Sequence, residues 1–222
     1  MNRSRFALLV ALVLTFPVLG GCVTARVEEI REGRTEMSGT DAIAVLGRRD
    51  RPSTNETEFD FVECVARNMG GTSGIPVVPD KVFRDTLFPW FEPRTAPVNT
   101  RDLPDLISHP AFVERLSGLG VKYIVWIEGS TRRTDSNGSM SCTASPAGAG
   151  CFGFLTWENN SQYEASIWDI HNGRAVGKVS SAAVGTSYMP ALIVPVPIIA
   201  RVKGSACSSL ADQLKTFLTA DS

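Results

Sequence analysis

Two groups of arginines are the residues of this sequence best suited to bind a ligand. Arg48, Arg49 and Arg51 follow the first predicted strand, and Arg132 and Arg133 follow the third. Guanidinium groups bind phosphate or carboxylate through paired hydrogen bonds. If the two strands are neighbours in a parallel sheet, both groups emerge at the switch point where α/β sheets bind ligands. The alternative is a set of solvated loop charges, because the sequence has neither a GxGxxG fingerprint nor a P-loop to hold a nucleotide.

Cys22 follows a segment with the features of an export signal. Two arginines precede an apolar run over residues 6–19, which is too short for a membrane-spanning helix. The run ends in Leu19-Gly20-Gly21-Cys22, which resembles the lipobox of bacterial lipoproteins. The resemblance implies that residues 1–21 are a signal peptide and that Cys22 carries acyl chains such as palmitate, enough for a stable membrane anchor. An ordinary secretory peptide with an incidental cysteine is the alternative.

Four further cysteines favour disulfides, because an exported protein folds in an oxidising compartment. Cys142 and Cys151 flank a loop rich in glycine and alanine, and a bridge between them would stabilise it by about 2.7 kcal/mol on the loop-entropy model. Cys64 and Cys207 each lie on the apolar face of a predicted helix, so their pairing would join early chain to late chain. Two free buried thiols are the alternative for this second pair.

The sequence predicts no catalytic or metal site. His109 precedes a proline and His171 falls in a predicted hairpin turn, and neither has a nucleophile at a recognisable spacing. The serines of 136–141 lie in a Gly-containing segment that we predict to be a loop, not a nucleophile elbow. The cysteines form no CxxC pair that suits zinc. We therefore expect no enzyme and no cofactor, and a hydrolase assembled from distant residues is the less favoured interpretation.

The charge balance argues against a nucleic-acid partner. Without residues 1–21 the chain keeps 20 basic against 23 acidic side chains, a net charge of −3, and it has no basic stripe interleaved with aromatic residues. The remaining length is enough for one domain with a sizeable core. We expect a tether over residues 22–39 and a single globular domain over residues 40–222.

Hydrophobic periodicity predicts an α/β fold with a mixed sheet. In the first part, strands at 42–46, 75–78 and 121–127 alternate with helices ending near residue 69 and spanning 102–118. This β-α-β-α-β order favours parallel strands with helices on the faces of the sheet. The continuous apolar run at 42–46 is typical of a strand covered on both faces. The later chain predicts antiparallel hairpin strands at 152–157, 162–170 and 175–187, with an Asn-Gly turn at 172–173, and a C-terminal helix at 205–220.

Four segments are similar to periplasmic domains of the curli-export lipoprotein type and to the TolB amino-terminal domain. They are the strand at 41–46, the Gly-Ile-Pro-Val-Val-Pro segment at 74–79, the strand at 120–127 and the hairpin at 167–174. The resemblance spans residues 41–180 and implies a fold used for protein contacts and envelope assembly, with no catalytic residues. Pore-forming members of that type carry long membrane hairpins, which this sequence does not predict.

Two apolar segments are candidate contact surfaces. Residues 189–199 carry no charge and three prolines, so they form neither a regular helix nor a central strand. They are either an extended segment laid over the core or an exposed patch for a partner or a lipid surface. On the second interpretation the contact residues are Leu192, Ile193, Val194, Val196, Ile198 and Ile199. The aromatic and proline-rich stretch at 88–93 is explained by packing in a satellite core or by a recognition groove.

These features together predict a non-enzymatic, membrane-anchored lipoprotein that binds or scaffolds other cell-envelope proteins. Binding of a small anion or ligand at the arginines is the alternative. The residue after Cys22 is Val23 and not aspartate, which by analogy with enteric lipoproteins favours the outer membrane, with the domain facing the periplasm.

Overall fold

The computed structural model describes residues 22–220 except 49–55, 72–73, 93 and 147. Its frame is a five-stranded sheet in the order β1-β5-β4-β3-β2. The strands are β1 (Val23–Arg31), β2 (Ala42–Gly47), β3 (Val121–Ser145), β4 (Gly148–Asp169) and β5 (Arg174–Ala191). Among these strands β2 and β3 run parallel, and the other neighbours run antiparallel. The predicted α/β class with a mixed sheet is confirmed.

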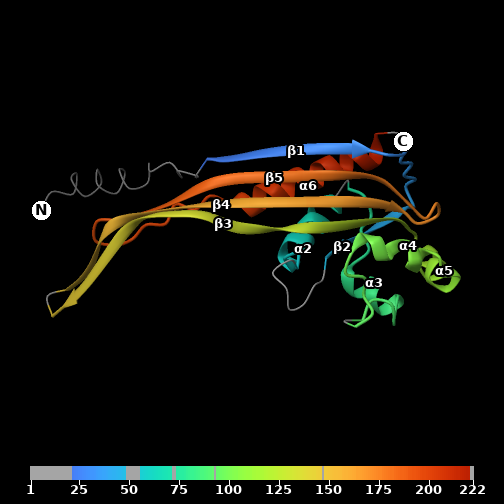
Figure 1. The fold of residues 1–222 in the computed structure, drawn as a ribbon, viewed down its shortest axis with the longest axis horizontal. Helices are drawn as coiled ribbons and strands as arrows, with labels where there is room; N and C mark the ends of the chain where they lie inside the picture. The colour runs from blue at the N-terminus through green and yellow to red at the C-terminus, as the bar shows by residue number, and fades with distance from the viewer. Residues whose placement is uncertain (1–21, 49–55, 72–73, 93, 147, 221–222) are drawn as a thin grey trace, which may run out of the picture.

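Helices cover both faces of the sheet at one end of the molecule (Figure 1). They are α2 (Phe59–Met69), α3 (Asp80–Thr86), α4 (Leu103–Ile107), α5 (Pro110–Gly118) and α6 (Val202–Thr219), with a 3-10 turn η1 (Thr100–Asp102) before α4. The apolar faces of α2 and α6 share one hydrophobic core, and α3, α4 and α5 contribute to a second core. The predicted C-terminal helix is α6.

Strand β2 contributes to both cores, which explains its unbroken apolar sequence. Ile43 and Val45 belong to the core with α2 and α6, while Ala44 and Leu46 belong to the core with α3, α4 and α5. Alternate side chains of a strand point to opposite faces, so a strand covered on both faces must be apolar throughout.

Two predicted elements of the first part are shorter than expected, and proline explains both. The strand at 75–78 is reduced to a single parallel bridge between Val77 and Ile43, because Pro79 directs the chain into α3. The helix at 102–118 is divided into η1, α4 and α5. Pro110 is the first residue of α5, where its missing N–H costs no helical hydrogen bond.

The prediction of a tether over residues 22–39 is wrong for residues 23–31, which are half of that segment. Residues 23–31 form β1, an edge strand paired with β5 from Val23↔Gly185 to Arg31↔Gly177. At its far end the Arg31 guanidinium lies 4.1 Å from the centre of the Phe217 ring of α6. Most β1 side chains are exposed, so main-chain hydrogen bonds to β5 hold the strand and its sequence carries little apolar pattern.

Strands β3, β4 and β5 continue beyond the helices as a long arm (Figure 1). We define the arm as residues 136–157 and 187–199. The pairing of β3 with β4 extends to Ser145↔Gly148, so the loops predicted at 136–141 and between Cys142 and Cys151 are instead parts of one long hairpin. Small residues dominate this stretch and show little alternation, and the main-chain ladder sets its structure.

Both predicted cysteine pairs are joined. Cys64 of α2 is bonded to Cys207 of α6, which links two helices on the same face of the sheet. Cys142 and Cys151 are bonded directly across the β3–β4 ladder in the arm, where they are register partners. The first bond therefore crosslinks the core, and the second crosslinks the arm.

The two disulfides are expected to contribute unequally to global stability. The variant with Cys64→Ala and Cys207→Ala should lose about 2–5 kcal/mol of unfolding free energy, because the bond closes a long loop between core helices. The matched variant with Cys142→Ala and Cys151→Ala should lose much less, because the arm lies outside both cores. Urea unfolding followed by circular dichroism measures both, and equal losses would contradict this assignment.

Candidate functional site

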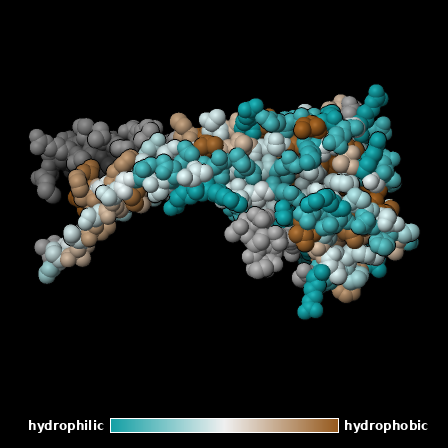
Figure 2. Space-filling view, viewed as in Figure 1, coloured by the Kyte–Doolittle hydropathy of each residue, from teal (hydrophilic) through white to brown (hydrophobic). Residues whose placement is uncertain are grey.

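One face of the sheet carries a polar surface beside the helical end. On this face α3, α4 and α5 pack against β2 and the start of β3, while neighbouring positions on β4, β5 and β1 are polar. Glu128 of β3 pairs in register with Glu164 of β4, Glu164 with Ser180 of β5, and Ser180 with Glu28 of β1. Three carboxylates therefore lie in one row across four strands, and Figure 2 shows hydrophilic side chains along these strands.

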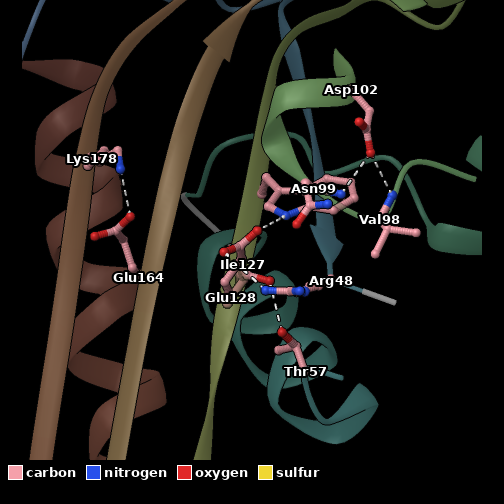
Figure 3. A network of polar contacts seen from close by, with 10 residues as sticks. Arg48, Thr57, Val98, Asn99, Asp102, Ile127, Glu128, Glu164 and Lys178 are labelled. Carbon is pink, nitrogen blue, oxygen red and sulfur yellow. Dashed lines mark hydrogen bonds and ion pairs between the residues drawn. The ribbon is translucent and has the colours of Figure 1, made fainter. Parts of the chain in front are cut away.

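Each carboxylate of this row has a cationic neighbour. The nitrogen–oxygen distances are 2.9 Å for Lys178–Glu164, 2.8 Å for Arg26–Glu28 and 3.9 Å for Arg48–Glu128. Figure 3 shows the Lys178–Glu164 contact between β5 and β4, and the contact of Arg48, just after β2, with Glu128 of β3. The hydrogen bond with Glu164 raises the pKa of Lys178. These pairs are solvent-accessible, so each contributes little to stability, and together they form an array of alternating charge.

Small residues leave a hollow of about 640 Å³ within this array. Gly129 has a φ of +141°, and a Cβ there would lie 2.1 Å from the carbonyl oxygen of Gln162, so only glycine fits. Ser180 and Ala182 line the same hollow. The resulting depression has donors and acceptors on several strands.

The structure brings two of the four predicted ligand-binding arginines together. Strands β2 and β3 are neighbours as expected, and Arg48 and Arg132 line the same hollow. Arg133 instead has its guanidinium 5.5 Å from the centre of the Trp157 ring. Arg49 lies outside the described residues. Glu128 sits 3.9 Å from Arg48, so an anion would compete with a carboxylate already present.

The two histidines of the sequence are not part of the hollow. His109 caps α5 and His171 lies in the turn after β4, and neither lines the hollow. Within the same residues there is no group of three His, Cys, Asp or Glu side chains that could hold a metal ion.

A polar network joins the start of α2 to β3 and β4, and no sequence pattern predicted it. The Tyr163 hydroxyl donates to Glu58 Oε2 at 2.9 Å, and Thr131 N–H donates to Glu58 Oε1 at 2.9 Å. The Tyr163 ring stacks on Phe61 of α2. Burial raises the pKa of Tyr163 far above its usual range, and the nearby Glu58 carboxylate acts in the same direction. Residues distant in sequence thus hold α2 against β3 and β4.

The end of the arm exposes large apolar side chains. Exposed fractions are 79% for Leu192, 70% for Ile193 and 71% for Phe152. Phe154, Tyr188, Val194, Val196 and Ile199 are also exposed, and Ile198 is half-buried. Of the two interpretations of 189–199, the exposed patch therefore agrees with the structure. Brown and pale side chains, with few teal ones, mark the free end of the arm in Figure 2.

Main-chain hydrogen bonds hold this segment against the arm while its side chains face outward. Cys151 N–H donates to the Ile193 carbonyl at 2.9 Å, and Ile198 and Tyr188 exchange two bonds of 2.7 and 2.9 Å. The segment is thus fixed by its backbone in an extended form, which suits its three prolines.

The stretch at 88–93 mainly packs inside. Phe91 is buried in the second core, and the Trp90 ring lies edge-on to Phe112 at 5.6 Å. Phe88 remains exposed. Packing therefore explains most of this stretch.

Comparison with known proteins gives limited similarity. No protein-family model matches the chain, and no curated protein matches it significantly. Among solved structures it is similar to two PelC dodecamers from Paraburkholderia phytofirmans, one of them a point variant. The point variant shares 14% sequence identity, with 89% of this chain and 99% of that chain aligned and a TM-score of 0.39. The other structure shares 13% identity, with 88% of this chain and 97% of that chain aligned and a TM-score of 0.38. Values this low establish neither family nor function, and the resemblance to the curli-export type stays a prediction.

Within the part of the chain that the structure describes, no helix is both long and apolar enough to cross a membrane.

Tyr163→Phe is expected to lower the free energy of unfolding by about 1–3 kcal/mol at pH 7, because the Glu58 carboxylate loses a buried donor. The folded-state pKa of Tyr163 is raised, so its contribution is complete below the usual tyrosine pKa of about 10 and declines above it. The difference between wild type and variant should therefore shrink at alkaline pH. Urea unfolding at pH 7 and at alkaline pH tests this, with the exposed Tyr188→Phe variant as control. A difference in unfolding free energy between wild type and Tyr163→Phe that does not change with pH would refute it.

Proposed function

We propose that this protein is a lipid-anchored, non-enzymatic component of the cell envelope that binds other envelope proteins. Cys22 is the acylated residue, the outer membrane holds it, and the domain faces the periplasm. The observation that carries this proposal is the exposed apolar end of the arm. Large exposed apolar patches mark interaction sites in folded proteins.

The charge distribution supports a contact role for the arm. No charged residue occurs from 136 to 157 or from 179 to 200, whereas the polar sheet face carries carboxylates and cations on four strands. The interaction surface we propose consists of Leu192, Ile193, Val194, Val196, Ile198 and Ile199. Such a surface has no role in a domain that works alone in water.

The position of Cys22 supports anchoring of the domain close to the membrane. Cys22 is exposed and directly precedes Val23, the first residue of β1. A lipid on this residue would attach to the edge of the sheet without an intervening tether. The anchored domain would then have little freedom to move away from the bilayer.

Making the arm polar should remove its contacts with partners. The variant with Leu192→Asp and Ile193→Asp should recover roughly tenfold less crosslinked envelope protein than wild type, because exposed side chains central to an interface carry much of its affinity. The measurement is mild crosslinking in the native bacterium, pulldown of the mature protein and mass spectrometry. Val82→Asp, at an exposed position on α3, is the matched control. Unchanged recovery from a folded double variant would exclude this surface.

Ligand binding at the polar hollow is the second candidate function, because Arg48 and Arg132 line it together. A binder should gain about 2.7 kcal/mol of stability at a ligand concentration of 100 times Kd. Thermal unfolding with inorganic phosphate, nucleotides and simple carboxylates tests this. The gain should disappear in Arg48→Ala with Arg132→Ala and persist in Arg67→Ala, an exposed position on α2. Flat curves across the panel would eliminate the candidate.

A further inference from the structure

We infer that the free end of the arm sits in the lipid–water interface of the bilayer that holds Cys22, with Trp157 and Tyr188 at its boundary. This inference rests on the lipidation of Cys22 in the proposed function. It adds the membrane surface to the envelope proteins proposed above as partners of the arm.

The sheet register places the anchor level with the start of the charge-free region. Val23 pairs with Gly185, and Gly185 pairs with Asn159, so Cys22 lies one position further toward the arm. The next pairs in that direction are Trp157↔Ser187 and Thr156↔Tyr188. With a rise of about 3.4 Å per residue, Trp157 and Tyr188 lie within about 10 Å of Cys22 measured along the strands.

Charged residues stop at the same level. Asp135 of β3 pairs with Glu158 of β4, and no charged residue follows on either strand toward the tip of the hairpin. Arg133 lies on the helical side of this pair, over the Trp157 ring. Along the strands toward the tip, charged residues are followed by Trp157 and Tyr188 and then by uncharged and apolar residues. Proteins that enter a membrane interface show the same order.

The main chain limits how deep the arm lies. The edge of β3 beyond β2 has no neighbour among the described strands. Unpaired main-chain groups in the hydrocarbon core cost several kcal/mol each, whereas headgroups and water can satisfy them. We therefore place the backbone of the arm at headgroup depth, with exposed side chains such as Phe152 and Ile193 reaching the acyl region.

The position of the proposed anchor favours the membrane as the occupant of the exposed apolar surface of the arm. Acyl chains on Cys22 would bring the bilayer to the level of Trp157, where the exposed apolar side chains begin. The membrane is therefore the occupant that the geometry favours.

Depth-dependent quenching tests this placement. The mature lipidated protein is reconstituted in phosphatidylcholine vesicles with or without brominated acyl chains, as wild type, Phe152→Trp and Phe59→Trp. Both positions are exposed, Phe152 on the arm (71%) and Phe59 on α2 (62%). Relative to wild type, the added emission at position 152 should fall at least about twofold in brominated vesicles, because interfacial side chains reach about 5–10 Å into the acyl boundary. The emission added at position 59 should not change.

Three outcomes would overturn the inference. Unquenched emission at 152 that is blue-shifted with or without lipid would show a second copy covering the arm. Equal quenching at 152 and 59 would show that the whole domain, not the arm, lies on the bilayer. Intact-mass measurement on the same samples separates the two proposals. An unmodified Cys22 would refute both the proposed function and this inference. An acylated Cys22 together with unquenched emission from the arm would refute this inference alone.

Discussion

The antiparallel ladder of β3, β4 and β5 is the constraint on which the rest of the structure depends. At one end these strands have helices on their faces, and their side chains there fill two hydrophobic cores. At the other end there is no core, and the same main-chain hydrogen bonds continue with a disulfide between Cys142 and Cys151. A stable body and an exposed arm are therefore parts of one sheet, and the arm inherits its direction from the body.

The two ends of this ladder have opposite surface chemistry. Near the helices the open face carries Glu28, Glu128 and Glu164, each beside a cation, around a hollow lined by small residues. Along the arm the charges end, and aromatic and branched apolar side chains are exposed. A surface of paired charges is well hydrated and can bind polar ligands, whereas the uncharged end of the arm suits a less polar environment.

The sequence predicted those elements whose side chains pack into the cores. Strand β2, the start of β3, the Asn-Gly turn and α6 all carry an apolar period or a turn signal, and each is present. Strand β1 was missed because most of its side chains are exposed and leave little apolar pattern. The outer part of β3 was missed because its serine, glycine and threonine residues leave no such period. For the candidate sites, the meeting of Arg48 with Arg132 followed from strand adjacency. The contact of Arg133 with Trp157 and the Glu58–Tyr163 network depend on side-chain packing between distant segments, which one sequence does not encode locally.

The start of β1 immediately after Cys22 has a mechanical consequence. With Cys22 acylated as proposed, a force between the lipid and the body of the domain would pull β1 along its own axis, since the strand begins at the next residue. Its hydrogen bonds to β5, from Val23↔Gly185 to Arg31↔Gly177, would then be loaded in shear and share the force, instead of opening one after another. The contact of Arg31 with Phe217 fixes the opposite end of the strand to α6. With Cys22 acylated as proposed, this edge strand would transmit force from the membrane to the domain.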